Sequence, residues 1–211
     1  MVISNETTRS VLATIDVQND FINGSLAVAD AEQVIAPLNT LRRAVRRAMG
    51  RVAFTRDWHP SVTPHFDTWP VHCVVGTEGA AFHPALTVGE GDVVLSKGTG
   101  QTDGYSGMEA VADDGTTLEM LVEPTHLHEA VRVFIGGLAT DYCVKATAID
   151  MARRFDAYDN VSVCVITDAM KAVNLTPDDE QKAIVEMADA GVHIINLEDA
   201  LMLVHEYTKE Q

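Results

Sequence analysis

Three side chains that could act together in nucleophilic chemistry follow short apolar segments typical of β-strands: Asp16, Lys97 and Cys143. The segments cover residues 11–17, 93–96 and 131–135. Ligands bind beyond the carboxyl ends of parallel strands, so we expect the three side chains to meet in one crevice. A thiol, an ammonium group and a carboxylate together could form the reacting centre of a cysteine hydrolase.

The sequence assigns a separate role to each of these groups. Cys143 is predicted in the first turn of a helix starting near Asp141, where the helix dipole and the ammonium of Lys97 would stabilise a thiolate. Asp16 would take the thiol proton and later give it to a leaving amine. Backbone N–H groups of Ala139 and Cys143 would form an oxyanion hole. Singly, each residue could be structural, and only their convergence predicts catalysis.

A second set of side chains has the composition of a metal site: Asp57, His59, His65 and His72. Asp57 and His59 follow the strand predicted over residues 51–55, at the start of a long aperiodic stretch, 57–91. One carboxylate with two imidazoles is a common ligand set for a catalytic transition metal. Single loop histidines are usually just exposed, but long loops inside a domain are often functional. An alternative makes Cys73 a ligand or nucleophile.

Strands and helices are predicted to alternate along the chain. Further strands are expected over 161–166 and 193–196, and helices over 31–49, 141–155 and 198–207. Another helix is expected to begin with Thr176 as N-cap, Pro177 at its first position and Asp179 in a capping box, and to stop at Gly191. This alternation predicts a three-layer α/β/α fold with a mainly parallel sheet.

Composition narrows the classes of protein. The 211 residues, 46% of them hydrophobic, contain no obvious linker, so one domain over residues 1–211 is expected. A net charge of -16 argues against nucleic acid as a partner.

No apolar run approaches the roughly 20 residues of a membrane span, and the polar segment 1–10 lacks a signal-peptide core. A cytoplasmic location is expected. Three cysteines, with Cys164 in an apolar run, fit a reducing compartment.

Several blocks, in order along nearly the whole chain, resemble the nicotinamidase/pyrazinamidase branch of the isochorismatase-like cysteine hydrolases. They are DVQNDF at 16–21, DWHP at 57–60, WPVHC at 69–73, GTEGA at 76–80, FHP at 82–84, KG at 97–98, YSG at 105–107 and GLATDYCV at 137–144. The resemblance implies a sheet of six parallel strands and a catalytic triad of Asp16, Lys97 and Cys143. It also implies a cis peptide bond between Leu138 and Ala139.

The resemblance further implies a substrate and a cofactor. The substrate would be nicotinamide, hydrolysed through a thioester to nicotinate and ammonia in NAD salvage and pyridine nucleotide biosynthesis. A divalent transition metal, zinc first and iron or manganese next, would hold the ring nitrogen. Its ligands would be Asp57, His59 and His72, with His65 as a further candidate. The residues implied to line the ring pocket are Phe21, Leu26, Trp69 and Tyr105, although Leu26 is equally typical of ordinary packing.

Two departures from the family pattern touch the rim of this pocket. Only three residues separate His65 from Trp69, and segment 21–25 lacks the paired glycines often found there. The alternatives are therefore another isochorismatase-like amidase that acts on a different small carboxamide, and a catalytically silent binding protein on the same fold. The sequence leaves the oligomeric state open, a homo-oligomer included.

Overall fold

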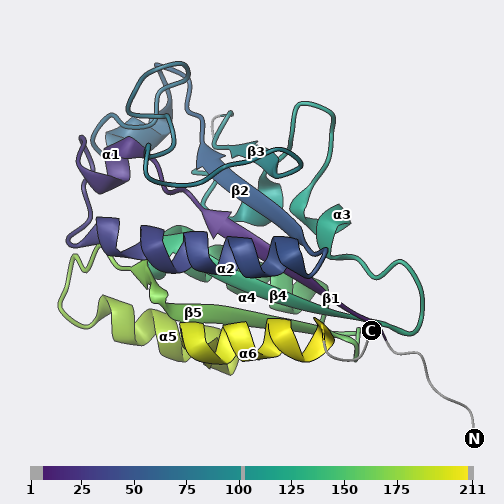
Figure 1. Ribbon diagram of the computed structural model, residues 1–211. Coiled ribbons are helices and arrows are strands. Elements are labelled where there is room, and N and C mark those ends of the chain that lie inside the picture. Colours follow the sequence, from purple (N-terminus) through teal and green to yellow (C-terminus); the bar gives the residue numbers. More distant parts are fainter. Residues whose placement is uncertain (1–6, 101–102, 209–211) are drawn as a thin grey trace, which may run out of the picture.

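The computed structural model describes residues 7–100 and 103–208, so most of the polar segment 1–10 lies outside it. Within this part of the chain, six strands form one sheet in the order β3-β2-β1-β4-β5-β6, and every pairing is parallel (Figure 1). The strands are β1 (Thr7–Ile15), β2 (Arg51–Asp57), β3 (Val93–Lys97), β4 (Glu129–Leu138), β5 (Val161–Lys171) and β6 (His193–Ile195). The predicted parallel sheet is confirmed.

Helices cover both faces of this sheet, which confirms the three-layer fold. On one face α2 (Ile35–Arg47) and α6 (Leu197–Thr208) lie side by side, in front of the sheet in Figure 1. The other face carries α3 (Leu118–Val122), α4 (Lys145–Arg154) and α5 (Asp179–Asp189). The short α1 (Asn19–Ile22) follows β1. The described residues also form three short 3-10 turns, η1 (Ala31–Val34), η2 (Pro64–Asp67) and η3 (Gly107–Glu109).

The core is divided by the sheet into two apolar clusters. Alternate residues of β1 point to opposite faces, as the two-residue period of a strand requires. Leu12 packs in the cluster under α2 and α6, whereas Val11 and Ala13 pack in the cluster under α4. Because both faces are covered, the central strands are apolar almost throughout, which is typical of a parallel sheet.

Strand β4 continues further than its sequence suggests. The strand segment expected from the sequence ends at residue 135, yet Gly137 still pairs with Ile15 of β1. Only glycine fits at this position. A Cβ on Gly137 would collide with the carbonyl oxygen of Ile15, and the φ of Gly137 is +131°, which other residues rarely adopt. The close approach brings the end of β4, and the cysteine turn after it, against the end of β1.

Helix boundaries differ in detail from those expected. The helix expected over 141–155 begins instead with a π-helical turn, η4 (Thr140–Val144), before α4. Thr176 does bond the side chain of Asp179, but the regular helix α5 starts only at Asp179, so the expected N-cap position is wrong. The expected stop is confirmed, because Gly191 has a φ of +87° and its N–H bonds the carbonyl of Ala188.

The sheet has a switch point between β1 and β4, where the chain changes the direction in which it adds strands. The segment between β2 and β3 lies above this region, together with α1 (Figure 1). Ligand sites of open α/β sheets lie in the crevice at such a point. In the part of the chain that is described, no helix has the length and apolar character that crossing a membrane requires.

We predict that Gly137→Ala costs about 3–5 kcal/mol of unfolding free energy, since it adds a left-handed backbone penalty to a backbone collision. Gly191→Ala is the matched control, because its φ is also positive but a Cβ there meets nothing. That variant should lose only about 1–2 kcal/mol. Urea denaturation measures both, and equal losses would contradict the close approach of β4 to β1.

Candidate active site

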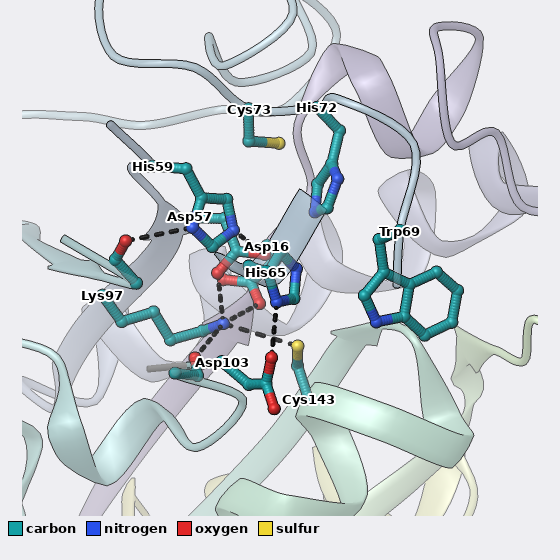
Figure 2. Close-up of polar contacts among 12 residues, drawn as sticks. Asp16, Asp57, His59, His65, Trp69, His72, Cys73, Lys97, Asp103 and Cys143 are labelled. Atoms are coloured by element: carbon teal, nitrogen blue, oxygen red, sulfur yellow. Dashed lines mark hydrogen bonds and ion pairs between the residues drawn. The ribbon is translucent and has the colours of Figure 1, made fainter. Parts of the chain in front are cut away.

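The three residues predicted to carry the chemistry converge at the carboxyl ends of their strands (Figure 2). Asp16 directly follows β1 in a left-handed conformation, with a φ of +50°. Lys97 is the last residue of β3, and its register partner on β2 is Asp57. Cys143 lies in the π-helical turn after β4. The parallel register therefore places side chains from four parts of the chain at one point.

The ammonium group of Lys97 is the centre of this cluster. Its Nζ lies 2.9 Å from Oδ2 of Asp16 and 2.5 Å from Oδ1 of Asp57. It is also 3.4 Å from Sγ of Cys143, and it donates to the carbonyl of Gly104 at 2.9 Å. Lys97 is almost entirely buried, so these partners take the place of water around its charge.

The ionisation of the cluster follows from burial and this central charge. Burial opposes the charged form of Lys97, but the acidic groups around it outweigh burial and raise its pKa well above the ordinary value. Burial alone would raise the pKa of Asp57, yet Lys97 and His59 hold it well below its usual range. For Asp16 burial wins over Lys97, and its pKa is raised. Lys97 and Asp57 are thus the fixed charges of the site.

The state of Cys143 differs from the thiolate expected at a helix start. Burial raises the pKa of its thiol well above the ordinary value, and Lys97 offsets only part of this effect. Carboxylate oxygens of Asp16 and Asp57 lie within 4.8 Å of the sulfur and raise the pKa of the thiol further. Cys143 is thus a thiol with a carboxylate beside it, and Asp16 is in place to remove its proton.

Three imidazoles form a second cluster beside the first. His59, His65 and His72 are all buried, and each offers a ring nitrogen within 4.8 Å of the others. Their Nδ1 atoms are occupied, by the carbonyl of Gly98, the carboxylate of Asp103 and the carbonyl of Pro70 respectively. The opposite Nε2 of His59 is buried without a hydrogen-bond partner. A divalent metal fits this arrangement, because Nδ1–H tautomers leave the Nε2 lone pairs available as ligands.

Two further observations support a metal at this cluster. Burial lowers the pKa of His72, which favours the neutral imidazole that metals bind. Oδ2 of Asp57 lies 3.7 Å from Nε2 of His59, while the other oxygen of Asp57 pairs with Lys97. Asp57 therefore stands between the two clusters. His65, only a further candidate from sequence, lies in the histidine cluster as fully as His59 and His72.

The alternative role for Cys73 receives no support. Its side chain is buried. Among the described residues, it belongs to neither of the two groups of candidate metal ligands. Burial also raises the pKa of its thiol far above the ordinary range. Its backbone N–H bonds the carboxylate of Asp20, and its φ is +45°. Cys73 shapes the turn after His72.

A pocket opens onto both clusters. It reaches Cys143, His65 and His72, and all four residues implied for the ring pocket line it: Phe21, Leu26, Trp69 and Tyr105. Trp69 donates its indole N–H to the hydroxyl of Tyr105 at 2.9 Å. Ala139 and Cys143, expected to hold the oxyanion, also line the pocket, and the peptide bond between Leu138 and Ala139 is cis, as the resemblance implies.

The sequence reasoning missed two further pocket residues. Tyr142 precedes the cysteine and packs edge-on against Trp69, with ring centroids 5.0 Å apart. Its place in the cysteine turn could have pointed to it. Val173 comes from the segment after β5, where nothing in the sequence signals a pocket wall. The side chain of Asp141 holds that segment by accepting the N–H groups of Val173 and Asn174, each at 2.9 Å.

The fold and the site define a class of hydrolase. Residues 10–199 match the isochorismatase domain, and the chain belongs to the isochorismatase family. It is 34% identical to the nicotinamidase/pyrazinamidase of Mycobacterium tuberculosis, covering 87% of this chain and 97% of that protein. It is 32% identical to the nicotinamidase of Escherichia coli, covering 89% and 95%.

A solved structure agrees with these relatives. The pyrazinamidase of Pyrococcus horikoshii in complex with zinc superposes with a TM-score of 0.75 at 32% identity, covering 89% of this chain and 99% of that one. The chain is thus an amidohydrolase of the isochorismatase family.

We predict that a small alkylating agent modifies Cys143 before Cys73 and Cys164, because only Cys143 lines the pocket. Since its pKa is raised, the thiolate fraction and the rate should still grow about tenfold per pH unit between pH 7 and 9. Peptide mass spectrometry of the protein, treated with a chelator, gives site and rate. A rate that levels off below pH 8 would show a stabilised thiolate instead.

Proposed function

We propose that this protein, folded as a single domain, hydrolyses nicotinamide to nicotinate and ammonia. The observation that carries the proposal is the pocket itself. Its lining combines Cys143, two members of the histidine cluster and several aromatic side chains. An aromatic carboxamide with a ring nitrogen has a carbonyl carbon for the thiol, a nitrogen for a metal at the histidines and a ring for the aromatic walls. The relatives named nicotinamidase support the same substrate.

The ring of such a substrate suits the walls of the pocket. Phe21, Trp69 and Tyr142 offer flat apolar surfaces, and aromatic rings gain from offset or edge contacts with such side chains. A small aliphatic amide would leave these surfaces largely in contact with water. The aromatic walls therefore favour nicotinamide over the alternative of a different, non-aromatic carboxamide.

The first half of the proposed reaction forms a thioester. Asp16 accepts the thiol proton as Sγ of Cys143 attacks the amide carbon, and the negative charge moves to the carbonyl oxygen. The N–H groups of Ala139 and Cys143 stabilise that oxygen. The C–N bond then breaks, and Asp16 returns the proton to the nitrogen, which leaves as ammonia. Lys97 keeps its charge and stabilises the anions formed on both sides of it.

The second half regenerates the cysteine. Asp16 accepts a proton from a water molecule, whose oxygen attacks the thioester carbon. The C–S bond breaks, the acid product leaves, and the proton on Asp16 returns to Sγ of Cys143. One water is consumed and one ammonia released, so the cycle closes without another reactant.

The histidine cluster would hold the divalent metal. We infer that His59, His65 and His72 bind it together with Asp57, and an N/O ligand set of this kind suits zinc first, with iron or manganese as alternatives. When bound, the metal supplies a Lewis acid that fixes the ring nitrogen and so sets the orientation of the amide. The chain's own residues carry the bond-making steps.

We predict that the wild-type protein releases ammonia from nicotinamide and pyrazinamide, and that Cys143→Ala loses this activity by a factor of about 10⁴ or more. Cys164→Ala is the matched control, because Cys164 is equally buried but lies in the core away from the pocket, and it should stay active. A wild-type protein inactive on both amides would reject the substrate. Full activity of Cys143→Ala would reject the nucleophile.

We further predict that removing the metal with a chelator lowers kcat/KM for nicotinamide by about 100-fold, mostly through KM, because the substrate loses its orientation. Adding zinc back should restore the value, and benzamide, which lacks the ring nitrogen, should respond far less. Steady-state kinetics of both amides, before and after treatment, make the comparison. Equal losses of kcat/KM for the two amides would mean that the metal does not act through the ring nitrogen.

A further inference from the structure

Residues 98–100 and 103–106, which follow β3, contact both clusters of the site. The carbonyl of Gly98 accepts from Nδ1 of His59 at 3.0 Å, and the carbonyl of Gly104 accepts from Nζ of Lys97 at 2.9 Å. Between them, Oδ1 of Asp103 lies 2.8 Å from Nδ1 of His65 (Figure 2). Asp103 belongs to neither the triad nor the ligand set, and sequence reasoning gives it no role.

The partner of His65 differs in kind from those of the other two histidines. His59 and His72 bond backbone carbonyls, whereas His65 bonds a carboxylate. The side chain of His65 is only 3% exposed, while that of Asp103 is 57% exposed. A carboxylate that reaches in from the surface to a buried ring nitrogen is an arrangement found behind metal-bound histidines.

Ring packing alone fixes neither the tautomer of His65 nor which way its ring faces. Its ring stacks on His59, with centroids 4.5 Å apart, and lies 6.0 Å from Tyr105. These contacts hold the plane of the ring, but they would be nearly unchanged if the ring turned over or the proton moved to the other nitrogen. The hydrogen bond to Asp103 distinguishes these states, because an ionised carboxylate can only accept and therefore requires that Nδ1, the nitrogen that faces it, carries the proton.

We propose that Asp103 is a positioning residue for His65, and through it for the metal. Its carboxylate holds the proton on Nδ1, turns Nε2 toward the histidine cluster and makes that nitrogen a stronger ligand. The inference rests on the proposed metal site. It also explains how His65, which comes from the short turn η2 rather than from a strand end, takes a defined place in the cluster.

The test is the affinity of the full-length protein for zinc alone, measured by competition with a chromophoric chelator at fixed pH and ionic strength. Asp103→Ala should weaken zinc binding by about 10- to 100-fold. Asp103→Asn keeps an oxygen that can accept from Nδ1–H and should lose less. Asp67→Ala is the matched control, since Asp67 is also acidic and exposed and lies two residues from His65. It should bind zinc within about twofold of wild type.

Each outcome decides a separate point. If the wild type binds no zinc, the metal site is rejected and the inference with it. If the wild type binds zinc and Asp103→Ala binds it equally well, only the role of Asp103 is rejected. Equal weakening in Asp103→Ala and Asp67→Ala would mean a general effect of charge, which also rejects positioning. Circular dichroism of each variant checks the fold, and Asp103→Asn serves if the alanine variant is unfolded.

A second measurement reports the geometry directly. The visible spectrum of cobalt(II) bound in place of zinc depends on the number and arrangement of its ligands. Asp103→Ala should change this spectrum at saturating cobalt, because His65 would no longer present Nε2 in one orientation. Asp67→Ala should leave it unchanged. Identical spectra for Asp103→Ala and wild type would overturn the proposal.

Discussion

A buried ammonium group lies where three parallel strands end, and the rest of the site is arranged around its charge. Lys97 has almost no contact with solvent, so it needs close anions to remain charged. Asp57 provides one from the neighbouring strand β2, and Asp16 provides the other from the end of β1, the strand beyond β2. Removing either would leave a charge unbalanced in the interior, which is more costly than losing an exposed ion pair. The cluster therefore ties the chemistry of the site to the stability of the sheet.

Two features of the sheet produce this arrangement: the register of its strands and one glycine. Asp57 and Lys97 are partners across β2 and β3, so their side chains meet without any loop having to fold toward them. Gly137 lets β4 run close beside β1, which brings the cysteine turn to Asp16. The histidines reach the site differently. His65 and His72 come from the segment between β2 and β3, and hydrogen bonds to neighbouring groups fix their rings.

This difference explains which parts could be predicted from the sequence. Strands of a parallel sheet are short, nearly continuous apolar runs, so the sheet and the strand-end residues Asp16 and Lys97 could be located from pattern alone. The extent of β4 could not, since Gly136 and Gly137 are typical of turns and only the neighbouring strand makes them extended. Val173 and Asp103 were missed because their roles depend on contacts between segments far apart in the sequence, which no local pattern encodes, whereas Tyr142 could have been found from its place beside Cys143.

The charges of the site also determine where its mobile proton lies. Four groups could hold a proton, and two of them are fixed: Lys97 keeps its proton and Asp57 lacks one, since their pKa values are shifted in opposite directions. Burial raises the pKa values of the other two groups, Asp16 and Cys143, so each of them favours its protonated form. In the reaction that we propose, the thiol proton is on Asp16 when the sulfur attacks, and Asp16 then passes it to the departing nitrogen. The acid needed for the second step of this proposed reaction is made by the first, so a raised thiol pKa is compatible with the proposed role of Cys143 as nucleophile.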